Sequence, residues 1–188
     1  MTKGNEIQLL ITDFDGTLVD TFDANLHAYQ KAFSSCGLNL TKEEYRKLFG
    51  LRFERFMNEM NIQEPEIRKH IQEIKSDVYP DFFNYLKVNT PLLTFIRAFK
   101  KNGGHTAIAS TARKKNLENA LLFIHATNDF DLILAGEDVK EGKPNPEVYQ
   151  KIIHHFKTDG THTLIFEDTA IGIEAARATG ANYINIKL

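Results

Sequence analysis

Apolar residues recur along this chain with two different spacings, and the spacing changes twice. The mostly apolar stretch Ile7–Ile11 is short and bounded by turn residues, which is typical of a buried strand in a parallel sheet. From Phe22 to Leu86 the apolar residues recur at helix spacing. Beyond Val88 short apolar runs return and alternate with helical stretches. This order predicts a Rossmann-like, doubly wound parallel α/β sheet with an inserted all-helical domain.

Turn and capping residues divide the insert into several helices. Gly37 ends the first helix, and the capping box Thr41-Lys42-Glu43-Glu44 opens the second, which Gly50 interrupts. Pro65 suits the first turn of a later helix, and Pro80 breaks or kinks that helix. The aromatic stripes of the insert are typical of a packed helical core rather than of a cofactor site.

Four more strands are predicted after the insert. They are the run up to Ser110, then Leu132–Ala135, Thr163–Phe166 and Tyr183–Ile186. Because strands that alternate with helices are joined by right-handed crossovers, these strands belong to the same parallel sheet as the first. The predicted domains are an α/β core of residues 1–19 and 89–188 and a helical insert of residues 20–88.

Composition and charge narrow the possible partners. The chain has 188 residues, of which 42% are hydrophobic, and a net charge of −2, so it can bury a sizeable core and lacks a strongly basic surface. No stretch approaches the ~20 apolar residues of a membrane span. Residues 1–6 are polar, unlike a signal peptide, and Cys36 is the only cysteine, so no internal disulfide is expected. We expect a cytoplasmic protein that binds neither nucleic acid nor membrane, and the sequence leaves its oligomeric state open.

Two carboxylates stand where the first predicted strand ends. Asp13 and Asp15 are two positions apart, so strand geometry points them roughly the same way, and Gly16 allows a sharp exit. The carboxyl ends of parallel strands are where open α/β sheets bind ligands. Taken alone, Asp-x-Asp-Gly is equally typical of an Asp-rich turn that caps a helix.

Further polar residues follow the later strands in the same way. Ser110 ends one apolar run, Lys143 stands in Gly142-Lys143-Pro144-Asn145-Pro146, and Glu167-Asp168 follow another run. Separately, these residues are typical of a helix cap, an exposed lysine and an acidic helix start. Together with Asp13-Phe14-Asp15-Gly16-Thr17-Leu18-Val19-Asp20-Thr21 they resemble, in order, the motifs of the haloacid dehalogenase superfamily. The resemblance extends from Ile7 to about the C-terminus.

This resemblance implies a phosphatase that uses a carboxylate nucleophile. Asp13 is the implied nucleophile, which forms an aspartyl-phosphate and so divides one difficult step into two easier ones. Asp15 is the implied general acid/base, a role that requires an environment raising its affinity for a proton. Lys143 supplies a positive charge, and Ser110 and Thr111 bind the phosphate of a small substrate, Ser110 through its hydroxyl and its backbone N–H.

The resemblance also implies Mg²⁺ as the cofactor. Asp13, the backbone carbonyl of Asp15 and Asp168 are the implied ligands, and Glu167 belongs to the metal site in or near the layer of residues directly behind these ligands. In the phosphoglycolate phosphatase and β-phosphoglucomutase branch, a helical insert of this length is a mobile cap that closes over the substrate.

Two arginines are candidates for contacts with the substrate. Arg52 lies between two predicted helices of the insert, in a loop that reaches the substrate in related caps. Arg113 follows Ser110 by three residues. For both, a solvated surface position is the alternative.

Two other functions stay open. One is a sugar-phosphate mutase of the β-phosphoglucomutase type, although Asn25 stands where that branch carries a His that ties cap closure to the acid/base Asp. The other is a non-catalytic phospho-acceptor or binding module. Receiver domains also use a phosphorylated Asp, but their acidic pair follows the first strand, whereas here the pair comes near the end.

Overall fold

The computed structural model describes residues 6–188. The chain forms two compact units: one contains the segment that ends at Asp20 together with Val88–Leu188, and the other is Thr21–Lys87. No helix of the described residues is long and apolar enough to cross a membrane. The expectation that residues 1–6 do not form a signal peptide concerns residues that, apart from Glu6, lie outside the part of the chain that the structure describes. The cytoplasmic location stays a prediction.

The first unit is built on one parallel sheet, which confirms the predicted α/β fold. Its strands are β1 (Leu9–Thr12), β4 (His105–Ala109), β5 (Leu132–Leu134), β6 (Thr163–Glu167) and β7 (Asn182–Asn185). Their order is β5-β4-β1-β6-β7, and every neighbouring pair is parallel. Leu9 lies opposite His105 on one side and Thr163 on the other, so β1 is the central strand and its carboxyl end is flanked by those of β4 and β6.

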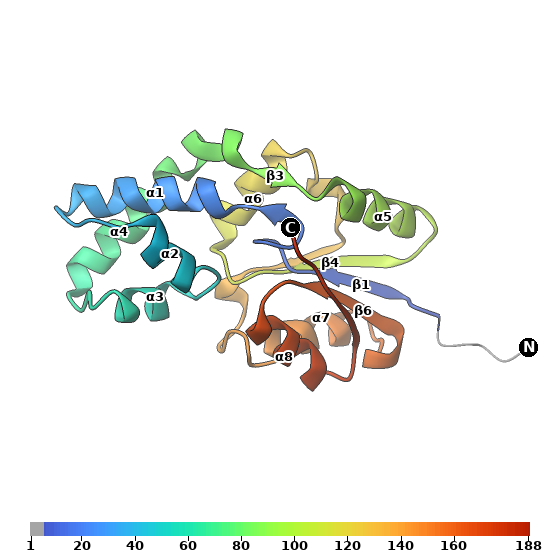
Figure 1. The fold of residues 1–188 in the computed structure, drawn as a ribbon. Helices are drawn as coiled ribbons and strands as arrows, with labels where there is room; N and C mark the ends of the chain where they lie inside the picture. The colour runs from blue at the N-terminus through green and yellow to red at the C-terminus, as the bar shows by residue number, and fades with distance from the viewer. Residues whose placement is uncertain (1–5) are drawn as a thin grey trace, which may run out of the picture. The chain divides into compact units, whose positions relative to one another are not determined.

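Helices cover both faces of this sheet (Figure 1). They are α5 (Thr90–Lys101), α6 (Lys114–Phe123), α7 (Glu147–His155) and α8 (Ala170–Ala178). Leu9 and Ile11 alternate along β1 to one face, where they pack with Tyr149 of α7 and Ala175 of α8. On the other face Phe95 of α5 meets Phe166 of β6 with ring centroids 6.0 Å apart. Both faces of the central strand β1 are therefore buried, as a continuous apolar strand requires, whereas the edge strand β7 is largely exposed.

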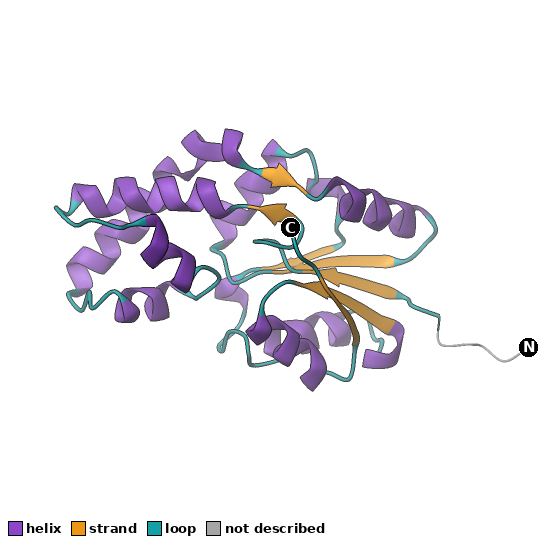
Figure 2. Ribbon diagram, viewed as in Figure 1, coloured by secondary structure: helices purple, strands orange, loops and turns teal. Residues whose placement is uncertain are grey.

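The second unit is helical (Figure 2). It contains α1 (Phe22–Ser35), α2 (Lys42–Leu48), α3 (Phe53–Glu59), α4 (Pro65–Val78) and the 3₁₀ helix η1 (Tyr79–Tyr85). The predicted capping box is present, because Thr41 accepts from the Glu44 amide and the Glu44 side chain accepts from the Thr41 amide. Phe33 and Phe56 stack in its aromatic core with centroids 5.9 Å apart.

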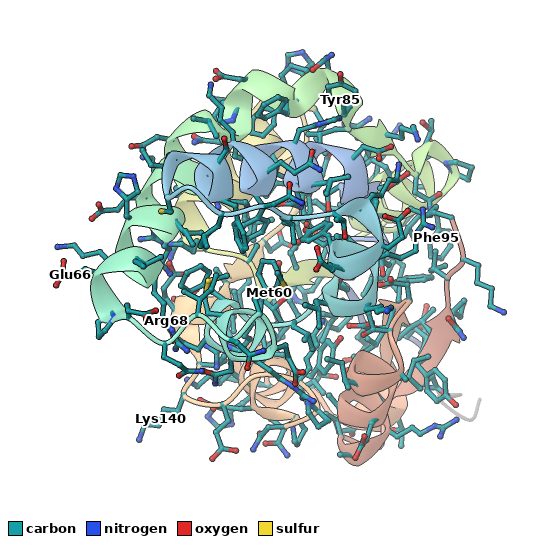
Figure 3. The ribbon with its side chains drawn as sticks, turned by 60° about the vertical axis from the view of Figure 1, so that its left-hand side comes forward. Met60, Glu66, Arg68, Tyr85, Phe95 and Lys140 are labelled. Carbon is teal, nitrogen blue, oxygen red and sulfur yellow. The ribbon has the colours of Figure 1, made fainter. Side chains whose placement is uncertain are left out.

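The side chain of Arg68 stabilises the turn between α3 and α4 (Figure 3). Its Nε donates to the Ile62 carbonyl at 2.7 Å, and its guanidinium pairs with Glu54 at 2.8 Å. The side chain is mostly covered, so these bonds hold the turn rather than face a ligand.

The structure adds short elements that apolar spacing does not predict. The strands β2 (Val19–Asp20) and β3 (Lys87–Val88) pair in a two-stranded sheet at the two chain crossings between the units. Three single-turn 3₁₀ helices, η2 (Thr127–Asp129), η3 (Gly136–Asp138) and η4 (Gly160–His162), lie in loops of the α/β unit. A two-residue strand is too short to show a period, which is why the sequence does not reveal it.

Candidate active site

Three segments that are distant in sequence meet at the carboxyl ends of β1 and β6. Asp13 follows β1, Glu167 ends β6, and Lys143 lies in the loop before α7. The Lys143 ammonium donates to Asp13 Oδ1 at 2.6 Å, to Glu167 Oε1 at 2.5 Å and to the Ala109 carbonyl at 3.1 Å. All three charged side chains are buried, at 7% exposure for Asp13, 8% for Lys143 and 0% for Glu167. The fold thus brings together three of the predicted site residues.

Burial and mutual charge shift the ionisation of this group. Burial raises the pKa of Asp13, and the negative charges of Glu167 and Asp168 raise it further while Lys143 opposes them. Burial disfavours the charged form of Lys143, but Asp13, Tyr149 and Glu167 together outweigh burial and raise the Lys143 pKa. For Glu167 the effect of burial is overcome by Lys143 together with the hydrogen bonds from Thr169 and Tyr149, which lower the pKa of that carboxyl. Lys143 and Glu167 are therefore held charged, whereas Asp13 lacks full compensation.

Glu167 is a fully hydrogen-bonded anchor. Its Oε1 accepts from Lys143 and from the Tyr149 hydroxyl, the latter at 3.0 Å. Its Oε2 accepts from the Asp168 amide and from the amide and hydroxyl of Thr169, each at 3.0 Å. A carboxylate offers about four lone-pair sites, so these donors leave none for a metal ion. Glu167 therefore belongs behind the expected ligand set and not in it.

Asp168 contacts the segment that follows β1, Asp13–Leu18, here called the β1 loop. The Thr17 hydroxyl donates to Asp168 Oδ1 at 2.8 Å. Gly16 has a φ of +89°, and a Cβ atom at this position would overlap the Asp168 carboxylate. Glycine is therefore required both by the backbone conformation and by this close approach. Burial, with the Glu167 charge, raises the pKa of Asp168 from its ordinary value of 3.8 to about 6.

Ser110 joins the site through its side chain only. Its hydroxyl donates to Asp15 Oδ2 at 3.4 Å and accepts from the Ala112 amide at 3.0 Å. Its backbone N–H donates to the Leu134 carbonyl of β5 at 2.9 Å. The expectation that this N–H also binds phosphate is therefore wrong, because sheet pairing occupies it.

The remaining candidates lie at less central positions. Thr111 is half-buried, directly after Ser110. Arg113 begins α6 as its N-cap, and its side chain, 43% exposed, lies 3.5 Å from Glu137. Arg113 therefore lies at the solvated surface, which was the alternative to a contact with the substrate. Arg52 is the N-cap residue of α3 in the helical unit, so its expected role stays a prediction.

Several residues that support the site have only weak sequence signals. Tyr149, Thr169 and Gly172 surround Glu167, and a Cβ atom at Gly172 would overlap its carboxylate. Tyr149 stands out in the sequence only as a hydroxyl on the otherwise apolar face of a helix. Gly172 stands out as a glycine inside a helix, which commonly has a packing reason.

The chain is similar to known hydrolases. The model of the family described as haloacid dehalogenase-like hydrolase matches residues 10–186. A phosphorylated carbohydrates phosphatase of Thermotoga maritima is 26% identical over 182 residues, which cover 95% of this chain and 84% of that protein.

Solved structures agree with this match. CbbY from Rhodobacter sphaeroides in complex with phosphate has a TM-score of 0.87 at 26% identity, covering 97% of this chain and 87% of that one. A mutant of CbbY in complex with xylulose-(1,5)bisphosphate has the same TM-score, 0.87, at 25% identity and with the same coverage of 97% and 87%.

Proposed function

The chain belongs to the haloacid dehalogenase-like hydrolase family, and on this premise we propose that it is a Mg²⁺-dependent phosphatase of small phosphorylated sugars. The observation that carries the proposal is the buried Asp13 at the end of the central strand, 2.6 Å from the Lys143 ammonium. Relatives named as phosphatases support the reaction, and one of them is named for phosphorylated carbohydrates.

The first half-reaction uses Asp13 as the nucleophile. A carboxylate oxygen of Asp13 forms a bond to phosphorus while the bond between phosphorus and the ester oxygen breaks. Asp15 gives its proton to that leaving oxygen, so the sugar departs as a neutral alcohol. In the absence of substrate the Ser110 hydroxyl donates to Asp15 Oδ2 at 3.4 Å, and when substrate binds its single proton turns to a phosphoryl oxygen.

The second half-reaction returns the enzyme to its starting state. Asp15, now a carboxylate, removes a proton from water as the water oxygen bonds to phosphorus and the bond to Asp13 breaks. Inorganic phosphate leaves, and Asp15 again holds the proton. Lys143 stabilises the negative charge on the phosphoryl group throughout, together with the Ser110 hydroxyl and the Thr111 amide.

The charges of the site fit a divalent cation. Among the described residues no group of three or more His, Cys, Asp or Glu side chains is arranged to hold a metal ion. Mg²⁺, however, usually takes only one or two carboxylates and completes its shell with water and substrate phosphate. Asp13, Glu167 and Asp168 carry three potential negative charges against the single Lys143 ammonium, which leaves two uncompensated. We assign Asp13, Asp168 and the Asp15 carbonyl as ligands, and bound Mg²⁺ would neutralise charge on the phosphoryl group and orient it.

The helical unit is proposed to act as the cap that determines which phosphate ester reacts. Its length and its place directly after the β1 loop support this role by resemblance to the family. Closing a cap excludes water from the first half-reaction and completes the binding site. Arg52 is the proposed contact for the part of the substrate that does not react.

A mutase is less well supported than a phosphatase. Asn25 is buried, and its amide lies 3.5 Å from the Tyr79 hydroxyl within the helical unit. An amide cannot change charge near neutral pH as a histidine can. A non-catalytic phospho-acceptor is not supported, because the relatives are named phosphatases.

The proposal is tested by turnover of a panel of phosphorylated sugars that includes β-glucose 1-phosphate and a bisphosphate primer. Free phosphate and isomerised sugar phosphate are measured in the same samples, with Mg²⁺ and with chelator. Asp13→Asn keeps the shape of the side chain but removes the nucleophile, so we expect activity to fall at least about 10⁴-fold. Full activity in chelator, near-normal turnover by pure Asp13→Asn, or isomerisation faster than phosphate release would each contradict the proposal.

A further inference from the structure

Asn89 lies where the chain returns to the α/β unit, directly before α5. Its backbone N–H donates to the Leu18 carbonyl at 2.8 Å, and its side-chain Nδ2 donates to the Thr17 carbonyl at 3.1 Å. Its Oδ1 accepts from the Leu92 amide at 3.2 Å, which makes Asn89 the N-cap of α5. One side chain therefore caps a helix with its oxygen and holds the β1 loop with its nitrogen.

Thr17 connects this grip to Asp168. Thr17 is fully buried. Its carbonyl accepts a hydrogen bond from Asn89 Nδ2, and its hydroxyl donates to Asp168 Oδ1 at 2.8 Å. The backbone of the neighbouring Gly16 lies so close that a Cβ atom there would overlap the same carboxylate. A displacement of the Thr17 backbone would therefore move the hydroxyl that orients Asp168.

A helix cap alone does not explain the amide of Asn89. Asp and Ser cap helices about as well as Asn, because each supplies the oxygen that the amide of the first turn needs. Unlike Asp and Ser, Asn also supplies the Nδ2 donor, and this donor forms the hydrogen bond to the Thr17 carbonyl.

We propose that Asn89 is a positioning residue for the metal site: it fixes Thr17, and Thr17 fixes the orientation of Asp168. This inference rests on the proposed function, in which Asp168 is a ligand of Mg²⁺. It also gives a role to the segment in which the chain re-enters the α/β unit. Asn89, the first residue after β3, holds the β1 loop, which carries Asp13 and Asp15.

Two substitutions separate positioning from capping. Asn89→Asp and Asn89→Ser keep the oxygen that caps α5 and remove the Nδ2 donor, and only the first adds a charge. Asn102→Ser is the matched control, because Asn102 Nδ2 donates to the Ala98 carbonyl at 2.8 Å at the far end of the same helix. Each pure protein is examined by thermal unfolding, by calorimetric titration with Mg²⁺, and by amide hydrogen exchange of the peptide spanning residues 13–19 without metal.

We expect both Asn89 variants to weaken Mg²⁺ binding by about fivefold, the effect of one ordinary hydrogen bond. The Gly16 and Val19 amides, which are bonded to the Val19 and Phe14 carbonyls, should exchange faster. Each variant, Asn102→Ser included, loses one hydrogen bond, so melting temperatures should fall by only about 2–4 °C. Asn102→Ser should change neither Mg²⁺ binding nor the exchange of the two amides.

Three results would overturn the inference. These are unchanged binding and exchange in both variants, weaker binding in Asn89→Asp alone, or equally weakened binding in the control Asn102→Ser. If the wild type itself binds no Mg²⁺, the proposed metal role fails, and the exchange measurement still decides whether Asn89 holds the β1 loop.

Discussion

At the scale of a single residue, the fold changes the ionisation of Asp168. Its pKa rises from 3.8 to about 6, first because the carboxyl is buried and then because Glu167 is negative. The folded protein therefore binds the proton of Asp168 more tightly than the unfolded chain does. It follows that this group costs no stability well below pH 4, and that its cost grows as the pH rises to about 6 and is then constant.

Asp168→Asn removes this cost while its amide oxygen can still accept from Thr17. In the presence of chelator, we expect the free energy of unfolding of the variant to exceed that of the wild type by at most roughly 3 kcal/mol at pH 7.5. Solvent screening makes the difference smaller than this limit. The advantage should shrink by about half at pH 5. Urea unfolding at the two pH values measures both quantities. An advantage that grows toward pH 5 would show that the sign is wrong.

At the scale of a single element, the start of α8 holds the Glu167 anchor. Thr169 caps the helix by accepting from the Gly172 amide at 3.0 Å, and its own amide and hydroxyl bind Glu167. The positive end of the helix dipole lies beside this carboxylate. Gly172 leaves the space that the carboxylate fills, although glycine is unfavourable inside a helix.

Gly172→Ala should therefore harm the site although alanine favours the helix. The added methyl group would displace the Glu167 carboxylate and with it Lys143, so we expect kcat to fall by at least about tenfold. Glu174→Ala, on the exposed part of the same helix, is the control and should leave kcat unchanged. Steady-state kinetics with a chromogenic phosphate ester gives the comparison, and a fully active Gly172→Ala would refute the anchoring role of α8.

At the scale of the whole molecule, we propose that chemistry and selectivity are divided between the two units. The α/β unit holds the charged group of Asp13, Lys143 and Glu167, whereas the helical unit holds an aromatic core and Arg52. If the helical unit is a cap, its residues act on the part of the substrate that does not react.

Arg52→Ala tests this division. The side chain of Arg52 makes no capping hydrogen bond at the start of α3, so the substitution should not weaken that helix end. We expect KM for the preferred sugar phosphate to rise about tenfold or more, while KM for a small chromogenic ester stays nearly constant. Arg55→Ala, exposed on α3, is the control. Equal changes for both substrates would favour a solvated surface position for Arg52.

The sequence by itself determined the features that depend on neighbouring residues. Apolar spacing identified the buried strands and the helices, the capping box at Thr41 and the proline at Pro65 marked two helix starts, and the order of short motifs identified the family. These signals are local because backbone conformation and solvent exposure repeat with a fixed period along each element.

Only the tertiary structure decided how the site is assembled. Lys143 meets Asp13 across 130 positions, and Thr17 meets Asp168 across 151. The Ser110 backbone N–H donates to the Leu134 carbonyl of β5, and Asn89 Nδ2 donates to the Thr17 carbonyl; neither partner could be read from the sequence. The physical reason is that a hydrogen bond between distant residues depends on which strands are neighbours in the sheet, and no local period of the sequence records that order.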